Sequence, residues 1–171
     1  MIHVYRRLRD GLTRVLEWLV IVMVMLITLD VLWGIATRTF GAQAVYTDEL
    51  ARMLLVWITM LGGALAFARK AHLGVDFFVG KMHPAARKTL AVIVQGVIIT
   101  LAVVVFIAGG VVLARAQWTQ ALPTMPWITK GIVYSAIPVS GLFILLFSLE
   151  NLMSIIRTPA ERIGAQTQSE G

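Results

Sequence analysis

The sequence predicts an all-α integral membrane protein with four transmembrane helices. Hydrophobic residues make up 58% of the chain and charged residues 14%, and the mean hydropathy is +0.84. Soluble domains usually contain about 45–50% apolar residues. A soluble domain of 171 residues could not bury so much apolar surface, so lipid is the expected solvent. The apolar runs are continuous and do not alternate with polar residues, which argues against a transmembrane β-barrel.

Four apolar segments are long enough to cross a membrane, since a helix needs roughly 20 residues to cross about 30 Å of hydrocarbon. The expected spans are residues 15–37, 47–68, 89–114 and 131–150. Asp30, Trp33 and Arg38 follow the first apolar run where a secretory signal would have a small-residue cleavage site, so this run is interpreted as a retained span. We expect one membrane domain over residues 1–171.

The distribution of basic residues predicts the orientation, because Lys and Arg concentrate in cytoplasmic segments. One side has eleven: Arg6, Arg7, Arg9, Arg14, Arg69, Lys70, Lys81, Arg87, Lys88, Arg157 and Arg162. The other side has three: Arg38, Arg115 and Lys130. Both termini are therefore expected in the cytoplasm. Four tryptophans fall near the predicted interfaces, as an aromatic belt requires: Trp18, Trp33, Trp118 and Trp127.

Two segments outside the spans have their own character. Residues 71–84 interleave apolar and polar side chains and are expected to lie along the cytoplasmic interface. The polar tail of residues 158–171 is expected to be flexible. The net charge of +6 comes from clusters beside apolar runs, so it indicates membrane flanks and no nucleic acid.

Asp30 is the acidic residue inside the first span, where a charge is costly and often functional. It could be an ion or proton site, or a structural contact that is hydrogen-bonded to a neighbouring helix or subunit. The structural interpretation is favoured, because the sequence shows no constellation of partner residues for this acid.

The start of the second span combines acids with an arginine. Asp48 and Glu49 should lie in the first helical turn, where negative charge suits the helix dipole. Glu49 and Arg52 are three residues apart, so they share a face and are predicted to pair. The pair could be an interfacial ion pair, a contact with a partner subunit, or both.

Small residues and prolines indicate packing positions. Gly62 and Gly63 permit close approach of a second helix, and internal packing is favoured over packing on a larger subunit. Pro138 should kink the fourth span near Tyr134. Two more prolines, Pro123 and Pro126, should stiffen the periplasmic connection.

The residues suggest no enzymatic chemistry. The sequence has no cysteine, and its histidines, His3, His72 and His83, lie outside the spans. A membrane anchor of a redox enzyme would ligate haem with mid-span histidines, so that class is disfavoured. No cofactor, metal or catalytic residue is expected.

The order of these patterns resembles the DctQ-type small membrane subunit of tripartite ATP-independent periplasmic (TRAP) transporters. The motifs are Arg38-Thr39-Phe40-Gly41, Thr47-Asp48-Glu49-Leu50-Ala51-Arg52, Trp57, Gly62-Gly63-Ala64, His72-Leu73-Gly74-Val75-Asp76, Pro123-Thr124-Met125-Pro126, Tyr134 and Pro138.

This resemblance implies an inner-membrane subunit that binds a large multi-spanning subunit. A periplasmic substrate-binding protein would deliver an organic acid, and an ion gradient, with sodium as the expected ion, would drive uptake. The small subunit would be part of the fixed scaffold.

Twelve residues are candidates for partner contacts: Asp30, Arg38, Asp48, Glu49, Arg52, Trp57, Gly62, Gly63, Pro123, Pro126, Tyr134 and Pro138. The alternative function is an autonomous small oligomeric transporter or channel. That alternative would need a continuous stripe of polar residues through the spans, and Asp30 is the only candidate member of such a stripe.

Overall fold

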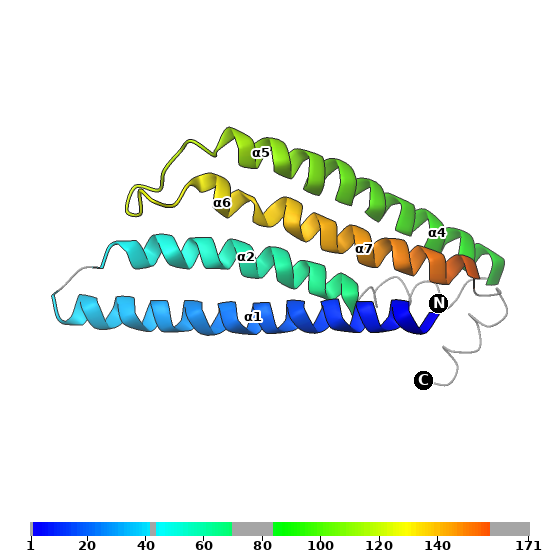
Figure 1. The fold of residues 1–171 in the computed structure, drawn as a ribbon, viewed down its shortest axis with the longest axis horizontal. Coiled ribbons are helices and arrows are strands. Elements are labelled where there is room, and N and C mark those ends of the chain that lie inside the picture. The colour runs from blue at the N-terminus through cyan, green and yellow to red at the C-terminus, as the bar shows by residue number, and fades with distance from the viewer. Residues whose placement is uncertain (1, 42–43, 70–83, 158–171) are drawn as a thin grey trace.

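A computed structural model describes residues 2–41, 44–69 and 84–157 (Figure 1). Their elements are α1 (Ile2–Thr39), α2 (Tyr46–Ala68), α4 (Pro84–Leu101), the π-helix η1 (Ala102–Gly109), α5 (Gly110–Ala116), α6 (Lys130–Tyr134) and α7 (Ala136–Arg157). Within the described ranges no strand forms, and one isolated bridge joins Ala121 and Thr129.

Four stretches of helix are long and apolar enough to cross a membrane. They are Arg9–Thr39, Tyr46–Ala68, Thr89–Ala116 and Lys130–Ile156. The third consists of α4, η1 and α5 in one continuous run, and the fourth of α6 and α7. The predicted all-α, four-span fold is confirmed, and each expected span lies within one of these stretches.

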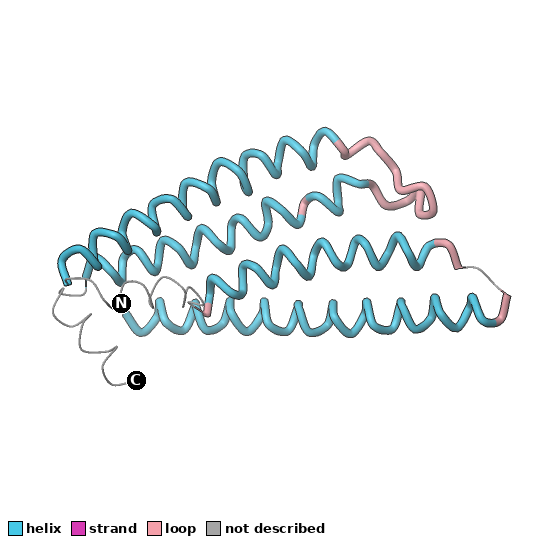
Figure 2. Tube along the Cα trace, turned by 180° about the vertical axis from the view of Figure 1, so that it is seen from behind, coloured by secondary structure: helices cyan, strands magenta, loops and turns pink. Residues whose placement is uncertain are grey.

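The helices lie in a row whose order differs from the chain order. Both ribbon views show the sequence α1, α2, α7, α4 across the molecule (Figures 1 and 2). α1 packs on α2, α2 packs on α7, and α7 packs on α4 and η1. The fourth span therefore lies between the second and the third, and α1 lies at one edge.

The start of α1 and the end of α7 lie at the same end of the row, here named the terminal end (Figure 1). The opposite end, named the loop end, holds the α1–α2 connection and the loop of residues 117–129. The expected interfacial segment 71–84, apart from Pro84 at the start of α4, and the expected tail 158–171 lie outside the described residues.

Two small apolar clusters hold the row together. The first contains Leu16, Leu61, Ala68 and Phe147, and it joins α1, α2 and α7. The second contains Ala64, Ala102 and Ile144, and it joins α2, η1 and α7. Alanines in both clusters let the helices approach closely, as is usual between transmembrane helices.

The third and fourth spans make the tightest contact. A Cβ added at Gly141 would lie 2.6 Å from the Cβ of Phe106, and one at Gly110 would lie 2.8 Å from Cδ of Pro138. The π-helix η1 thus packs against the proline-containing segment of the fourth span. Closer to the terminal end, the buried amide of Gln95 donates a hydrogen bond of 3.0 Å to the carbonyl of Ser148.

The fourth span breaks at Ser135, between α6 and α7. Pro138 has no N–H to donate to the carbonyl four residues earlier, which belongs to Tyr134. The interruption of the helix at Ser135 lies beside Tyr134, where the sequence predicts a kink.

Charged side chains tie the helices together at the terminal end. Arg9 of α1 donates to the carbonyl of Ala68 at 2.6 Å and lies 3.4 Å from a carboxylate oxygen of Glu150 in α7. Arg9 therefore caps the end of α2, where helix carbonyls lack partners. Beside it, Arg69 pairs with Glu17 at 2.8 Å.

Candidate functional site

The loop end brings together most of the polar residues that the sequence marks out. Asp48 and Glu49 lie in the first turn of α2, as expected. One carboxylate oxygen of Glu49 accepts the backbone N–H of Thr124 at 2.9 Å and also the Thr124 hydroxyl. This contact ties the start of α2 to the loop of residues 117–129, and we name it the Glu49–Thr124 latch.

The predicted pairing of Glu49 with Arg52 is wrong. The ion pairs among the described residues join Arg9 to Glu150, Arg38 to Asp48 and Arg69 to Glu17, and none includes Glu49 or Arg52. Glu49 turns toward the loop, where a backbone N–H and a hydroxyl satisfy it. Arg52 lies on the exposed side of α2 without a hydrogen-bond partner in the described part of the chain.

Arg38 connects α1 to α2 near the loop end. Its guanidinium donates to both carboxylate oxygens of Asp48 at 3.0 Å, and both side chains are about 60% exposed. Beside this pair, the indole of Trp33 donates to the hydroxyl of Tyr46 at 3.1 Å. Exposed ion pairs contribute little stability, so these contacts chiefly set how α1 and α2 meet.

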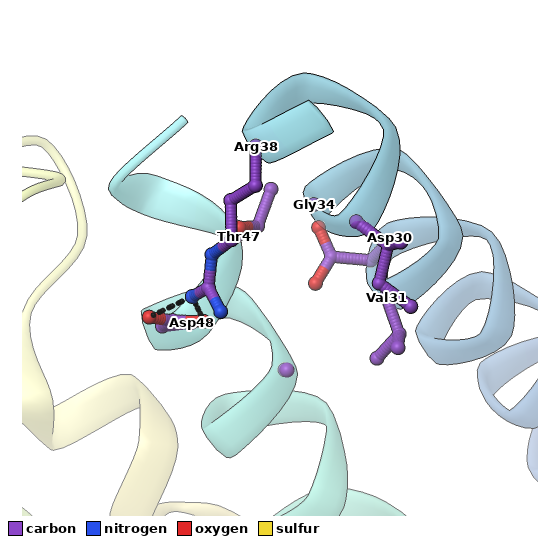
Figure 3. Close-up of a pocket in the computed structure, with 8 residues that line it drawn as sticks. Asp30, Val31, Gly34, Arg38, Thr47 and Asp48 are labelled. Carbon is purple, nitrogen blue, oxygen red and sulfur yellow. Dashed lines mark hydrogen bonds and ion pairs between the residues drawn. The ribbon is translucent and has the colours of Figure 1, made fainter. Parts of the chain in front are cut away.

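A cavity of about 90 Å³ lies between α1 and α2 beside this ion pair. Figure 3 shows the Asp30 carboxylate and the Arg38 side chain entering the space from α1, while Thr47 and Asp48 border it from α2. Asp30 Oδ2 is shielded and has no hydrogen-bond partner among the described residues. The predicted hydrogen bond from Asp30 to a neighbouring helix is therefore absent from this part of the chain.

The loop of residues 117–129 is held in a defined conformation by backbone hydrogen bonds. Leu122 donates its N–H to the carbonyl of Ile128 at 2.9 Å, and Lys130 donates its N–H to the carbonyl of Gln120 at 2.8 Å. The side chain of Met125 is buried. The exposed residues at this end of the two final spans include two prolines and two tryptophans: Pro123, Pro126, Trp118 and Trp127.

The outer face of α2 is the second candidate surface, and it is defined by Arg52, Leu55, Thr59, Gly63 and Ala66. These residues recur every three or four positions, so they lie on one side of the helix. All five are exposed. This face is opposite the buried residues Leu54, Leu61 and Ala68, which repeat every seven positions.

The favoured expectation that Gly62 and Gly63 serve internal packing is wrong. A Cβ added at either glycine would meet no atom within 4 Å. The glycines that do allow close approach are Gly110, Gly131 and Gly141, together with Gly34, whose Cβ position lies 3.0 Å from the Thr47 hydroxyl oxygen. The helix periodicity alone could not distinguish these two groups.

Three of the twelve candidates lie inside the row. Trp57 packs against the first apolar cluster, and its indole nitrogen is shielded and unpaired among the described residues. Pro138 fills the space above Gly110, and Tyr134 is half-buried at the break between α6 and α7.

The sequence interpretation missed Thr124 as the partner of Glu49. It also missed Gly34 and Thr47 at the α1–α2 contact. The described residues contain no group of three or more His, Cys, Asp or Glu side chains that could hold a metal ion. The site therefore consists of the Glu49–Thr124 latch, the Arg38–Asp48 ion pair and the exposed outer face of α2. These features suit the packing of helices and the binding of a partner.

Comparisons with known proteins agree on one family. The family model described as "Tripartite ATP-independent periplasmic transporters, DctQ component" matches residues 23–158. The chain is 30% identical over 148 residues to the "Sialic acid TRAP transporter small permease protein SiaQ" of Vibrio cholerae, covering 83% of this chain and 82% of that protein. It is also 24% identical over 113 residues to the "Sialic acid TRAP transporter permease protein SiaT" of Haemophilus influenzae, covering 65% of this chain and 18% of that protein.

Proposed function

The chain belongs to the DctQ component family of TRAP transporters, and from this premise we propose that it is a lateral scaffold that binds the large subunit through the outer face of α2. As a member of this family with four apolar helices, it is a small transporter subunit and a multi-pass protein of the bacterial inner membrane. The basic residues at the terminal end favour that end as the cytoplasmic one.

The observation that carries the scaffold role is the open, small-residue face of α2. Beyond Leu55, the residues of this face are small: Thr59, Gly63 and Ala66. Lipid does not require small residues, whereas a second helix can approach closely only where side chains are small. Arg52 at the loop end of the face would donate to a carboxylate or a helix carbonyl of the partner, because its guanidinium has no acceptor among the described residues.

The relative SiaT supports a large partner. The region similar to this chain makes up 18% of SiaT, which is named a TRAP transporter permease protein. A sequence similar to this small chain therefore forms one part of a much longer TRAP permease. We propose that the same two parts meet here as separate chains.

The proposed solute is an organic acid, and its uptake would be coupled to an ion gradient, with sodium as the expected ion. Relatives named for sialic acid, which is a carboxylic acid, support the solute class. The polar cavity beside Asp30 is lined only by residues from the loop-end parts of α1 and α2. That geometry favours a scaffold over an autonomous transporter or channel.

The loop end would face the periplasm and dock the substrate-binding protein. The latch holds Pro123 and Pro126 in place on the exposed side of the loop. A preorganised loop loses little conformational freedom when a partner binds. This supports the loop of residues 117–129 as part of the docking surface.

Co-purification tests the scaffold role with a matched pair of variants. Gly63→Leu fills the open face of α2, while Gly96→Leu places the same side chain on α4, where a Cβ also meets no atom within 4 Å. We expect Gly63→Leu to reduce recovery of the large subunit several-fold and Gly96→Leu to leave it unchanged. Equal recovery with both variants would refute the assignment of the α2 face.

Reconstitution tests the function itself. Liposomes that contain this chain alone should take up organic acid no faster than empty liposomes. Adding the large subunit and the substrate-binding protein should give saturable uptake that depends on an ion gradient. Saturable uptake by the chain alone would establish the autonomous transporter instead.

A further inference from the structure

A groove of about 380 Å³ runs along the outer side of α1 near the terminal end. Its lining residues all belong to α1 and are Arg14, Val15, Trp18, Leu19 and Val22. Trp18 is 66% exposed and Val15 is 58% exposed, so no described helix covers the groove. The groove has apolar walls and an arginine at the end nearest the N-terminus.

Arg14 has no anionic partner in the described part of the chain. Glu17, one turn away, is held by Arg69 at 2.8 Å. Glu150 at the same end of the row pairs with Arg9. Asp10 is exposed one turn before Arg14 and forms no ion pair with it. The guanidinium therefore keeps its hydrogen-bond donors available for an external anion.

The positions of the lining residues along α1 match the order of the phosphate, glycerol and acyl regions of a lipid molecule. Trp18 lies one turn further along α1 than Arg14, and Val22 lies one turn further again. At about 1.5 Å per residue, the distance from Arg14 to Val22 along the axis is about 12 Å. With Trp18 at the headgroup level, the four residues on to Val22 take the groove about 6 Å into the roughly 15 Å of hydrocarbon in one leaflet. Tryptophan prefers the headgroup level, which is where this order places Trp18.

We propose that this groove binds one anionic glycerophospholipid of the leaflet at the terminal end. Arg14 binds the phosphate, Trp18 lies beside the glycerol region, and an acyl chain follows Val15, Leu19 and Val22. The large side chains of this face leave no room for the close backbone approach that the small residues of the outer face of α2 permit. An anionic headgroup is favoured because the ammonium of a zwitterionic lipid would lie close to the guanidinium.

Native mass spectrometry of the full chain with added phosphatidylglycerol or phosphatidylcholine tests the proposal. The wild type should retain one phosphatidylglycerol in preference to phosphatidylcholine. Arg14→Gln should weaken phosphatidylglycerol binding about fivefold, which is the effect of one basic residue near an anionic surface. Arg115→Gln is the matched control, because Arg115 is also an exposed arginine at the end of a span, without a partner among the described residues. Equal weakening by both variants would show a general charge effect and overturn the proposal.

Two further measurements distinguish other occupants. Leu19→Trp fills the groove but keeps Arg14, so it should also displace the lipid, and inorganic phosphate should not compete with phosphatidylglycerol. Competition by phosphate alone would reduce the site to an anion contact and overturn the lipid assignment. In the purified complex, cross-linking of Leu19→Cys to the large subunit together with loss of the retained lipid would show that protein occupies the groove. Retention of phosphatidylglycerol by the complex would support the proposal.

Discussion

Replacing Glu49 by alanine should release the loop of residues 117–129 from the start of α2. The Glu49 carboxylate accepts two hydrogen bonds from Thr124, one from the backbone N–H at 2.9 Å and one from the hydroxyl. Both are part-buried. The alanine variant therefore leaves two donors without their acceptor.

The size of the effect follows from the charge of the acceptor. A hydrogen bond to a charged group contributes about 1.5–3 kcal/mol when it is well shielded. The latch is half-exposed at the edge of the membrane, so water can replace part of the loss, and we expect a total of about 2 kcal/mol. That corresponds to a roughly 30-fold rise in the open population of the loop. Glu49→Gln keeps an acceptor oxygen and should cost about 1 kcal/mol.

Hydrogen exchange of the Thr124 amide measures the opening directly. In Glu49→Ala the amide should exchange roughly 30-fold faster than in the wild type. Arg52→Ala is the matched control, because it removes a charge from the same turn without touching the latch, and it should leave the amide unchanged. Unaltered exchange in Glu49→Ala, or equal acceleration in Arg52→Ala, would refute the latch and revive the pairing of Glu49 with Arg52.

Three other perturbations test the fold. Gly141→Ala should lower the free energy of unfolding by about 1–3 kcal/mol in a detergent titration, because its methyl group would overlap the third span. Gly63→Ala should leave the isolated chain unchanged, and equal losses would contradict the packing described above. A cysteine at Phe40 should react with an impermeant thiol reagent from the periplasm, whereas one at Ser154 should not, and the reverse pattern would invert the orientation. Arg9→Ala should destabilise the terminal end by about 1–2 kcal/mol in the same titration, since the capped carbonyl and a carboxylate lose their donor; an unchanged midpoint would mean that water replaces the arginine.

The four spans could be predicted because their signals are local. A continuous apolar run of the right length needs no knowledge of its neighbours. The break beside Tyr134 follows in the same way from the missing N–H of Pro138. The prediction of function depended on the order of the motifs along the chain. The spacing of individual residues could not supply it, because no residue in the spans suggests a reaction.

The order of helices in the row could not be predicted, because it depends on matches between distant residues. Gly141 meets Phe106 and Gly110 meets Pro138, and these pairs bring the fourth span beside the third. The predicted pairing within the candidate site was wrong for a similar reason. A spacing of three residues permits Glu49 and Arg52 to pair, but the partner that Glu49 has lies 75 positions away along the chain.

The π-helix in the third span has a consequence for the length of the chain. Each turn closed by a hydrogen bond from i to i+5 contains one residue more than a turn of α-helix. The segment Ala102–Gly109 therefore holds one residue more than an α-helix would need to join α4 to α5 in the same rotational phase. Removing one residue there should convert the segment to α-helix and still leave Gly110 facing Pro138. This is the point in the span where a single-residue deletion changes the local winding without changing which faces meet.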